Sequence, residues 1–274
     1  MSNNLLFLSL GPLSVLVFLL LEYLRNTAKG NKTKAEKIKR QAKSKEQFFK
    51  RLTVYLFIAL TGLAVSLLSS HNLLMPLVAV FSPLEIISIS SIAIPLYLNM
   101  VLSFLSIDLC QYWVHRLHHK IPFLWRLHRL HHSDKNVDSL TTFLHHPIEI
   151  LSTFVVSITL YILFDIPMII LLAYSIVFSL HAAFTHTSLT INSRLEKYLG
   201  YVIVTPSIHR LHHALDFRES NSNFGQVFSF WDRLFGSYIK PAPTKKALIF
   251  GISKDQSPSS LSLKNFLANP IRKN

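Results

Sequence analysis

Cysteine and charge are both scarce in this chain of 274 residues. A single cysteine, Cys110, excludes an internal disulfide bond, and its place in an apolar run favours a small buried side chain. Only 15% of the residues are charged, and Lys and Arg are missing altogether from residues 52–114 and 136–193. The sequence has no HExxH motif and no glycine-rich dinucleotide fingerprint, which excludes a zinc protease of that type and a dinucleotide-binding domain.

Hydrophobic residues fill the uncharged stretches. Half of the residues are hydrophobic, and four long runs are almost entirely apolar: 5–24, 52–68, 84–107 and 148–184. About 20 apolar residues in a helix cross the hydrocarbon core of a bilayer. The pattern therefore predicts a protein that crosses the membrane several times. The first run lacks the basic start and the cleavage pattern of a signal peptide, so we interpret it as a retained helix.

The net charge of +14 is distributed unevenly along the chain. All 28 Lys and Arg lie in three segments, with eleven in 25–51, five in 116–135 and twelve in 194–273. Cytoplasmic loops of membrane proteins carry the Lys and Arg excess, so all three segments are predicted to be cytoplasmic. Anionic lipid headgroups are the natural counter-charge, and we expect no nucleic acid partner.

This assignment makes the run 148–184 a hairpin that leaves the cytoplasmic side and returns. Its turn is predicted at Asp165, Ile166 and Pro167. Each arm has about 17 residues, or roughly 25 Å at the rise of a helix, which is slightly short for a full span. The preceding run, 84–107, is predicted to return the chain to a cytoplasmic segment, 109–147.

The histidines gather in the predicted cytoplasmic regions. Three clusters share the sequence His-Arg-Leu-His-His and begin at His115, His128 and His209. Residues three and four apart share a face of a helix, so each cluster can direct several imidazoles at one point. Without His118, the least certain member, eight histidines remain, too many for one tetrahedral zinc and suited to two metals in one cavity. No carboxylate lies inside a cluster, which disfavours a carboxylate-bridged ferritin-type site.

Motifs around these clusters resemble the fatty acid hydroxylase/sterol desaturase superfamily. They extend from about Ser106 to Tyr238, and their order and spacing both match. The motifs are DLCQYWVHRLHH (108–119), FLWRLHRLHHS (123–133), HPIE (146–149), HTS (186–188), TPSIHRLHH (205–213), NFG (223–225) and WDRLFGSY (231–238).

The resemblance implies a non-haem centre of two iron ions that activates O₂. Such a centre inserts oxygen into, or removes hydrogens from, an unactivated C–H bond of a lipid. The resemblance leaves out His118, and it matches His146 and His186 to further histidines of the superfamily; His145 and His181 have no clear counterpart. The implied metal ligands are His115, His119, His128, His131, His132, His146, His186, His209, His212 and His213.

Four polar residues are expected to support the site. A ligating histidine usually donates its second N–H to a carboxylate or a carbonyl. Asp108 precedes His115 by seven residues, hence on the same helical face, and an acid near the membrane boundary is functional by default. Glu149 and Asp232 are similar candidates, and Asn223 is expected to shape a turn near the site.

The predicted fold is all-α, with polytopic transmembrane helices and a cytoplasmic helical cap that holds the histidine cluster. Residues 1–51 are interpreted as a transmembrane helix and a basic cytoplasmic linker. Residues 52–240 form the domain that resembles the superfamily, and residues 241–274 are a polar, basic tail.

The predicted function is O₂-dependent hydroxylation or desaturation of a lipid drawn from the bilayer. A separate electron-donor protein is implied, because the chain has no room for a fused redox domain, and the basic face could attract an acidic donor. The alternatives are a histidine-rich metal transporter and a metal-binding scaffold. Transporters place ionisable residues in the middle of their helices, whereas these spans are nearly free of them.

Overall fold

The computed structural model describes residues 91–241 without a gap and short pieces on either side. The predicted linker 25–51, the predicted span 52–68 and most of the tail 241–274 lie outside the described residues. The described residues are 17–18, 20–22, 24, 80, 86, 88–89, 91–241 and 248–252.

The predicted hairpin is confirmed. Helix α6 (Pro147–Phe164) and helix α7 (Met168–His186) are joined by the turn at Asp165, whose φ of 46° is left-handed. Pro167 follows at the start of α7, where its missing N–H does no harm. Both helices are long and apolar enough to cross a membrane, and only 13% and 28% of their most apolar windows are buried inside the protein. Core helices of a soluble fold would be mostly buried, so these helices suit a lipid environment.

The third predicted span, 84–107, is wrong at both ends. Helix α4 runs from Leu96 to Lys120, so it starts later and continues far past residue 107. Pro95 precedes it, and the side-chain amide of Asn99 donates to the carbonyl of Ile89, which ties the preceding segment against the helix. Beyond residue 107 the hydropathy falls but no glycine or proline occurs before Pro122, so the helix itself carries the first histidine cluster.

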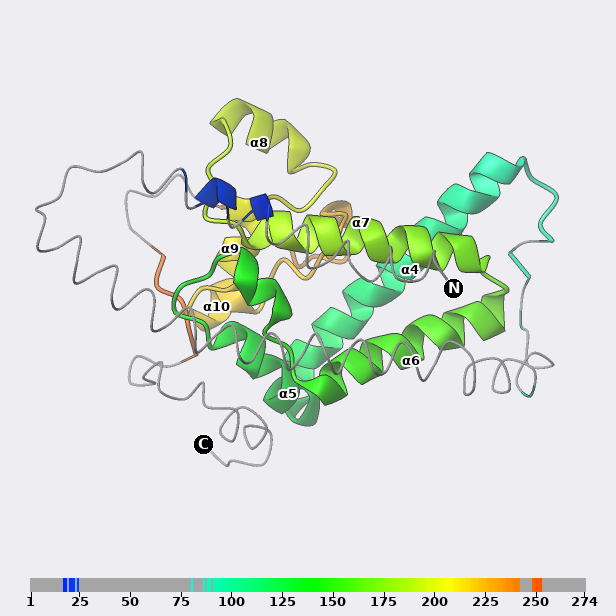
Figure 1. Cartoon of the computed structure of the whole chain (residues 1–274), viewed down its shortest axis with the longest axis horizontal. Helices are drawn as coiled ribbons and strands as arrows, with labels where there is room; N and C mark the ends of the chain where they lie inside the picture. The colour runs from blue at the N-terminus through cyan, green and yellow to red at the C-terminus, as the bar shows by residue number, and fades with distance from the viewer. Residues whose placement is uncertain are drawn as a thin grey trace, which may run out of the picture.

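The short helices gather at one end of these three long helices (Figure 1). Proline at the first position starts α5 and α9, each after a residue in extended conformation. The short elements are α5 (Pro122–His132), the 3₁₀ helix η3 (Ser139–Phe143), α8 (Ser193–Leu199), α9 (Pro206–His212), α10 (Phe217–Ser220) and α11 (Phe230–Leu234). The part of the chain that the structure describes has no strands, only two isolated bridges, and its helical class is as predicted.

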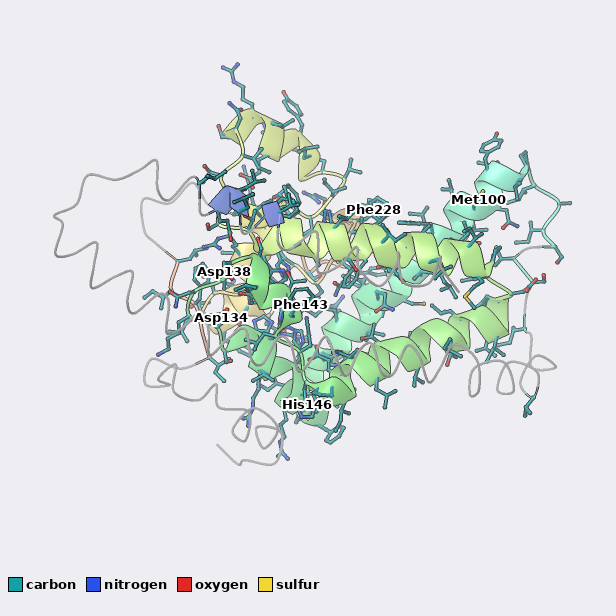
Figure 2. All side chains as sticks on the ribbon, in the orientation of Figure 1. Met100, Asp134, Asp138, Phe143, His146 and Phe228 are labelled. Atoms are coloured by element: carbon teal, nitrogen blue, oxygen red, sulfur yellow. The ribbon has the colours of Figure 1, made fainter. Side chains whose placement is uncertain are left out.

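Two apolar clusters hold the long helices and the cap together. The larger contains Ile107, Leu160, Ile170 and Tyr174, and so joins α4, α6 and α7. The smaller joins Leu130, Leu140, Leu144 and Ala183 beside the short elements. Figure 2 places Met100 toward the far end of α4 and His146 at the cap, where α6 begins. The histidine clusters therefore lie where α4 and α7 end and α6 begins.

Candidate metal centre

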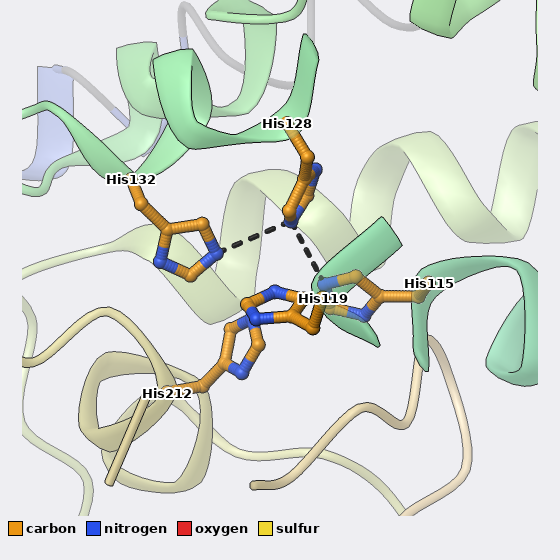
Figure 3. Close-up of side chains that lie close together, drawn as sticks. All are labelled: His115, His119, His128, His132 and His212. Atoms are coloured by element: carbon orange, nitrogen blue, oxygen red, sulfur yellow. Dashed lines mark hydrogen bonds between the residues drawn. The ribbon is translucent and has the colours of Figure 1, made fainter. Parts of the chain in front are cut away.

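Within the described residues, nine histidines form two adjacent groups, and a further candidate group joins His128 to His145 and Glu149. In each group the candidate ligand atoms lie within 4.8 Å of one another. Site 1 is drawn in Figure 3 and takes residues from α4, α5 and α9, whereas site 2 takes residues from α5, α7 and α9 with the residue after it. Site 1 consists of His115, His119, His128, His132 and His212, and site 2 of His131, His186, His209 and His213.

Helical spacing explains how each cluster is divided. On α5, His128 and His132 are four residues apart and share site 1, while His131 turns to site 2. On α9 the division is reversed, because His209 and His213 share site 2 and His212 turns to site 1. Residues at i+3 and i+4 both lie on the face of residue i but are offset to opposite sides, by roughly 60° and 40°, so the last two histidines of a cluster diverge by about 100°. One short helix can therefore serve two neighbouring sites.

These imidazoles are neutral at physiological pH. All are buried except His119, which is partly exposed. Burial lowers the pKa of His132 and of His131 well below the ordinary value, and neighbouring imidazoles lower it further. Burial also lowers the pKa of His212 to about 3. A neutral imidazole keeps one nitrogen lone pair, which is the form that binds a metal.

Hydrogen bonds direct those lone pairs inward. The Nδ1–H of His115 donates to the carbonyl of Phe224 (2.9 Å), and that of His212 donates to the carbonyl of Ser222 (2.7 Å). The Nδ1–H of His128 donates to Oε1 of Glu149 (2.6 Å). Because a carbonyl or a carboxylate only accepts, each ring carries its proton on Nδ1 and its lone pair on Nε2.

The Nε2 atoms of His115 and His128 then face each other with no proton between them, and the other rings also turn Nε2 toward their neighbours. In site 1, Nε2 of His128 lies 3.2 Å from Nε2 of His115 and 3.2 Å from that of His132. In site 2, Nε2 of His186 lies 2.9 Å from that of His209, 3.0 Å from that of His131 and 3.1 Å from that of His213. Facing lone pairs at these distances repel unless a cation lies among them.

A metal ion accounts for this arrangement. Metal–imidazole bonds of about 2.1 Å place neighbouring nitrogens about 3.0 Å apart at right angles and about 3.4 Å apart at a tetrahedral angle. Within the described residues, the buried Nε2 atoms of His119 and His212 have no hydrogen-bond partner. An all-imidazole donor set suits iron, zinc, copper or nickel. Both sites therefore fit a transition-metal ion.

Comparison with known proteins agrees with this geometry. The family model described as fatty acid hydroxylase matches residues 100–237, which is half of the chain. The chain belongs to the fatty acid hydroxylase family. This confirms the resemblance stated from the motifs. No solved structure matches the chain.

Several curated proteins are similar over the same region. Alkylglycerol monooxygenase of Danio rerio is 30% identical over 156 residues, which cover 56% of this chain and 32% of that protein. Ornithine lipid hydroxylase OlsE of Rhizobium tropici is 30% identical over 160 residues, 58% of this chain and 47% of that protein. Human lathosterol oxidase is 29% identical over 147 residues, 52% of this chain and 46% of that protein. The chain thus aligns with between a third and a half of the length of these relatives.

Nine of the ten histidines predicted as ligands lie in the two groups, and His146 does not. It precedes the first turn of α6, where its Nδ1 accepts from the N–H of Ile148 (3.2 Å). His186, which the motifs supported equally, faces three other histidines in site 2. His118, which the resemblance leaves out, donates from Nδ1 to the carbonyl of Val114 (2.7 Å) and lies outside both groups.

Glu149 makes the contact that a supporting carboxylate should make. Its Oε1 accepts from His128 and also from Nδ1 of His145 (3.0 Å), whose ring stacks on that of His131 with centroids 4.2 Å apart. His145 has no superfamily counterpart and was left out of the predicted site. The sequence does contain a signal for His145. It lies four residues before Glu149, so its ring can reach that carboxylate along the first turn of α6.

Asp108 and Asp232 contact no histidine and instead hold the loop 222–228. Asp108 accepts from the hydroxyl of Tyr174 (2.8 Å), the indole N–H of Trp231 (2.9 Å) and the N–H groups of Val227 and Phe228. Asp108 thus shares a face of α4 with His115, as predicted, but it contacts the loop that holds His115 and not a histidine itself.

The other end of this loop is held by Asp232 and Asn223. Asp232 accepts from the N–H groups of Phe224 (2.7 Å) and Gly225 (2.8 Å), and from the hydroxyl of Ser237. Burial raises the pKa of Asp232, and these donors partly offset the effect. Asn223 has a left-handed φ of 55°, and its side chain pairs with the backbone of Ile239, as expected of a residue that shapes a turn. The loop then presents two carbonyls to ligands of site 1.

Proposed function

We propose that this chain is an integral membrane oxidoreductase that uses two iron ions and O₂ to hydroxylate or desaturate a lipid. The observation that carries the proposal is the pair of neighbouring sites in which imidazoles, all but one of them buried, turn their Nε2 atoms toward one another. Two metals held side by side can together supply the electrons that O₂ activation needs, and one metal supplies fewer.

Iron is favoured over the other ions that imidazoles bind. The similar proteins are named as a monooxygenase, a hydroxylase and an oxidase, and each of these names describes an oxidation. Zinc has no redox chemistry, so a zinc pair would not serve such a reaction. Bound iron would supply the capacity to reduce O₂ and to break a strong C–H bond.

The residues of the chain would then hold the iron ions, orient the ligand rings and shield the site from bulk water. Glu149 and the carbonyls of Ser222 and Phe224 fix the rings of site 1, and a ligand fixed in this way need not reorganise during the reaction. Fully buried apolar side chains, including Tyr112, Phe224 and Leu127, help to exclude bulk water from the cap. The substrate carbon has to be positioned by apolar contacts, because a lipid chain offers no hydrogen bonds.

The membrane arrangement is part of the proposal. The helices α4, α6 and α7 expose apolar side chains, among them Val101, Val155 and Ile169, and their ends meet at the histidines. A lipid could therefore approach laterally from the bilayer. The distribution of Lys and Arg supports several crossings, with the histidines on the cytoplasmic side. A separate electron donor is also proposed, and an acidic protein would suit the basic cytoplasmic face.

The test combines metal analysis with lipid mass spectrometry. The purified protein should contain two irons per chain, and cells that express it should accumulate an O₂-dependent lipid product. A product heavier by one oxygen would mean hydroxylation, and one lighter by two hydrogens would mean desaturation. Metal flux in proteoliposomes without any lipid product would instead support the transporter alternative.

A further inference from the structure

One buried acid lies outside the family match. Glu22 belongs to the helical residues 17–24, of which 19 and 23 are not described, and only 5% of its surface is exposed. The family model begins at residue 100. Figure 1 shows this segment in blue, beside the end of α7 that carries His186. A buried carboxylate is unfavourable unless donors surround it, so its partners indicate what it does.

Glu22 accepts hydrogen bonds from residues that directly follow a metal-site histidine. Its Oε1 accepts from the hydroxyl of Thr187 (2.9 Å) and from the N–H of Ser188. These two residues come immediately after His186, the histidine whose Nε2 faces the other three in site 2. The carboxylate therefore fixes the exit of the chain from α7 at the point where the ligand is presented.

The second carboxylate oxygen reaches η3, which also contacts the His186 ring. Oε2 lies 3.5 Å from the N–H of Ser139, which starts η3. Within η3, the hydroxyl of Thr142 lies 3.3 Å from Nδ1 of His186 and donates to the carbonyl of Ala182 (3.2 Å). Nδ1 of His186 donates to that same carbonyl (2.7 Å). Glu22 thus joins the two segments between which the His186 ring is held.

Packing orients the acid toward this position. Phe18, one helical turn before Glu22, packs against Phe184 with ring centroids 6.1 Å apart and against the smaller apolar cluster. The charge lies near the C-terminal end of α7, where the helix dipole disfavours an anion. General helix stabilisation therefore does not explain an acid here, whereas donors fixed around His186 do.

We infer that Glu22 is a positioning residue for the metal in site 2, so that the segment which carries Glu22 supports the metal centre. The inference rests on the proposed function, because it requires that site 2 binds a metal. Loss of the Glu22 carboxylate should loosen His186 and weaken metal binding at site 2 while leaving site 1 intact. Removal of a residue that hydrogen-bonds to a metal ligand typically lowers the metal affinity by about 10–100-fold.

The experiment is a Co²⁺ titration of the metal-free, full-length protein in detergent, followed by the visible spectrum of the bound ion. His115→Ala and His209→Ala provide the reference spectra of proteins that keep only site 2 or only site 1. Glu22→Ala should bind one Co²⁺ as tightly as wild type, with the spectrum of site 1, and a second at least about 10-fold more weakly. Glu22→Gln keeps an oxygen acceptor for Thr187 and Ser188 and should restore most of the second binding step.

Two controls make the result specific. Phe18→Leu keeps an apolar contact and every carboxylate bond, and Glu219→Gln removes an acid outside both sites; each should bind two Co²⁺ ions like wild type. Unchanged binding of both ions by Glu22→Ala would overturn the inference, as would equal weakening of both sites. If the wild-type protein bound fewer than two ions, the proposed function itself would fall, and the inference with it.

Discussion

Asp232 and His115 lie on different elements and are linked through the backbone of a single residue, Phe224. Oδ1 of Asp232 accepts the N–H of Phe224 (2.7 Å), and the carbonyl of Phe224 accepts the Nδ1–H of His115 (2.9 Å). The carboxylate thus fixes a ligand of site 1 without touching it. These two hydrogen bonds explain how Asp232, the acid of the WDRLFGSY motif, can orient a ligand of the candidate metal centre.

Asp232→Asn should therefore weaken metal binding at site 1. The substituted amide presents an NH₂ group to one of the three donors that now point at the carboxylate, and the loop loses a bond. We expect a loss of about 10–100-fold in metal affinity at site 1, with site 2 unchanged, measured by metal titration. Asp216→Asn, at the exposed cap of α10, is the control. Wild-type affinity in Asp232→Asn would show that this link has no function.

Substitution of single histidines should separate the two sites. His212→Ala should remove the metal from site 1 and His131→Ala that from site 2, and both should abolish activity while membrane insertion is retained. His146→Ala should keep both metals, because its nitrogens lie outside both groups, although it loses a helix cap worth about 1 kcal/mol. Iron analysis of the purified variants is the measurement. Loss of iron in His146→Ala would restore His146 as a ligand.

Gly225→Ala should destabilise the loop that holds site 1. A Cβ atom at this position would lie 2.6 Å from the carbonyl of Phe228 and 2.8 Å from Oδ2 of Asp232. Because the first neighbour is backbone, the loop must shift, and we expect a loss of about 1–3 kcal/mol and a lower Tm in detergent. Gly236→Ala tests the alternative that any glycine matters, since Gly236 has a positive φ but no neighbour within 4 Å. It should reduce the stability by only about 1 kcal/mol.

The metal-free protein should lose stability as the pH falls. Burial lowers the pKa of His132, His209 and His213 in the folded protein, while the unfolded chain titrates near pH 6.5. Below that pH the unfolded chain binds protons that the folded protein excludes, so the free energy of unfolding decreases between about pH 7 and pH 4. Thermal unfolding of metal-free protein in detergent at several pH values checks this. A Tm independent of pH over that range would mean that the folded protein does not hold these imidazoles in a buried, neutral form.

Much of the framework could be predicted from the sequence because helical periodicity and hydropathy are local signals. Asp165 and Pro167 identify the hairpin turn. The repeated His-Arg-Leu-His-His pattern contains nine histidines, and all of them except His118 lie in the two groups of the candidate metal centre. What periodicity does not show is the division of a cluster between two sites. His131 and His132 are adjacent in sequence and lie in different groups, which depends on how α5 is rotated against α7 and α9.

The supporting contacts were harder to predict because most of them use the backbone. The carbonyls of Ser222 and Phe224 fix His212 and His115, and no residue type marks a carbonyl as an acceptor. The boundaries of α4 were misjudged for a different reason. Its hydropathy falls where Asp108 and Gln111 turn inward, but nothing in the chain interrupts the helix there.

The most direct test of the account is metal analysis combined with X-ray absorption on protein purified from membranes. We expect two irons per chain, each surrounded by histidine nitrogens at about 2.1 Å, as metal–imidazole bonds require. A chain with fewer than two metals, or with sulfur as a principal ligand, would contradict it.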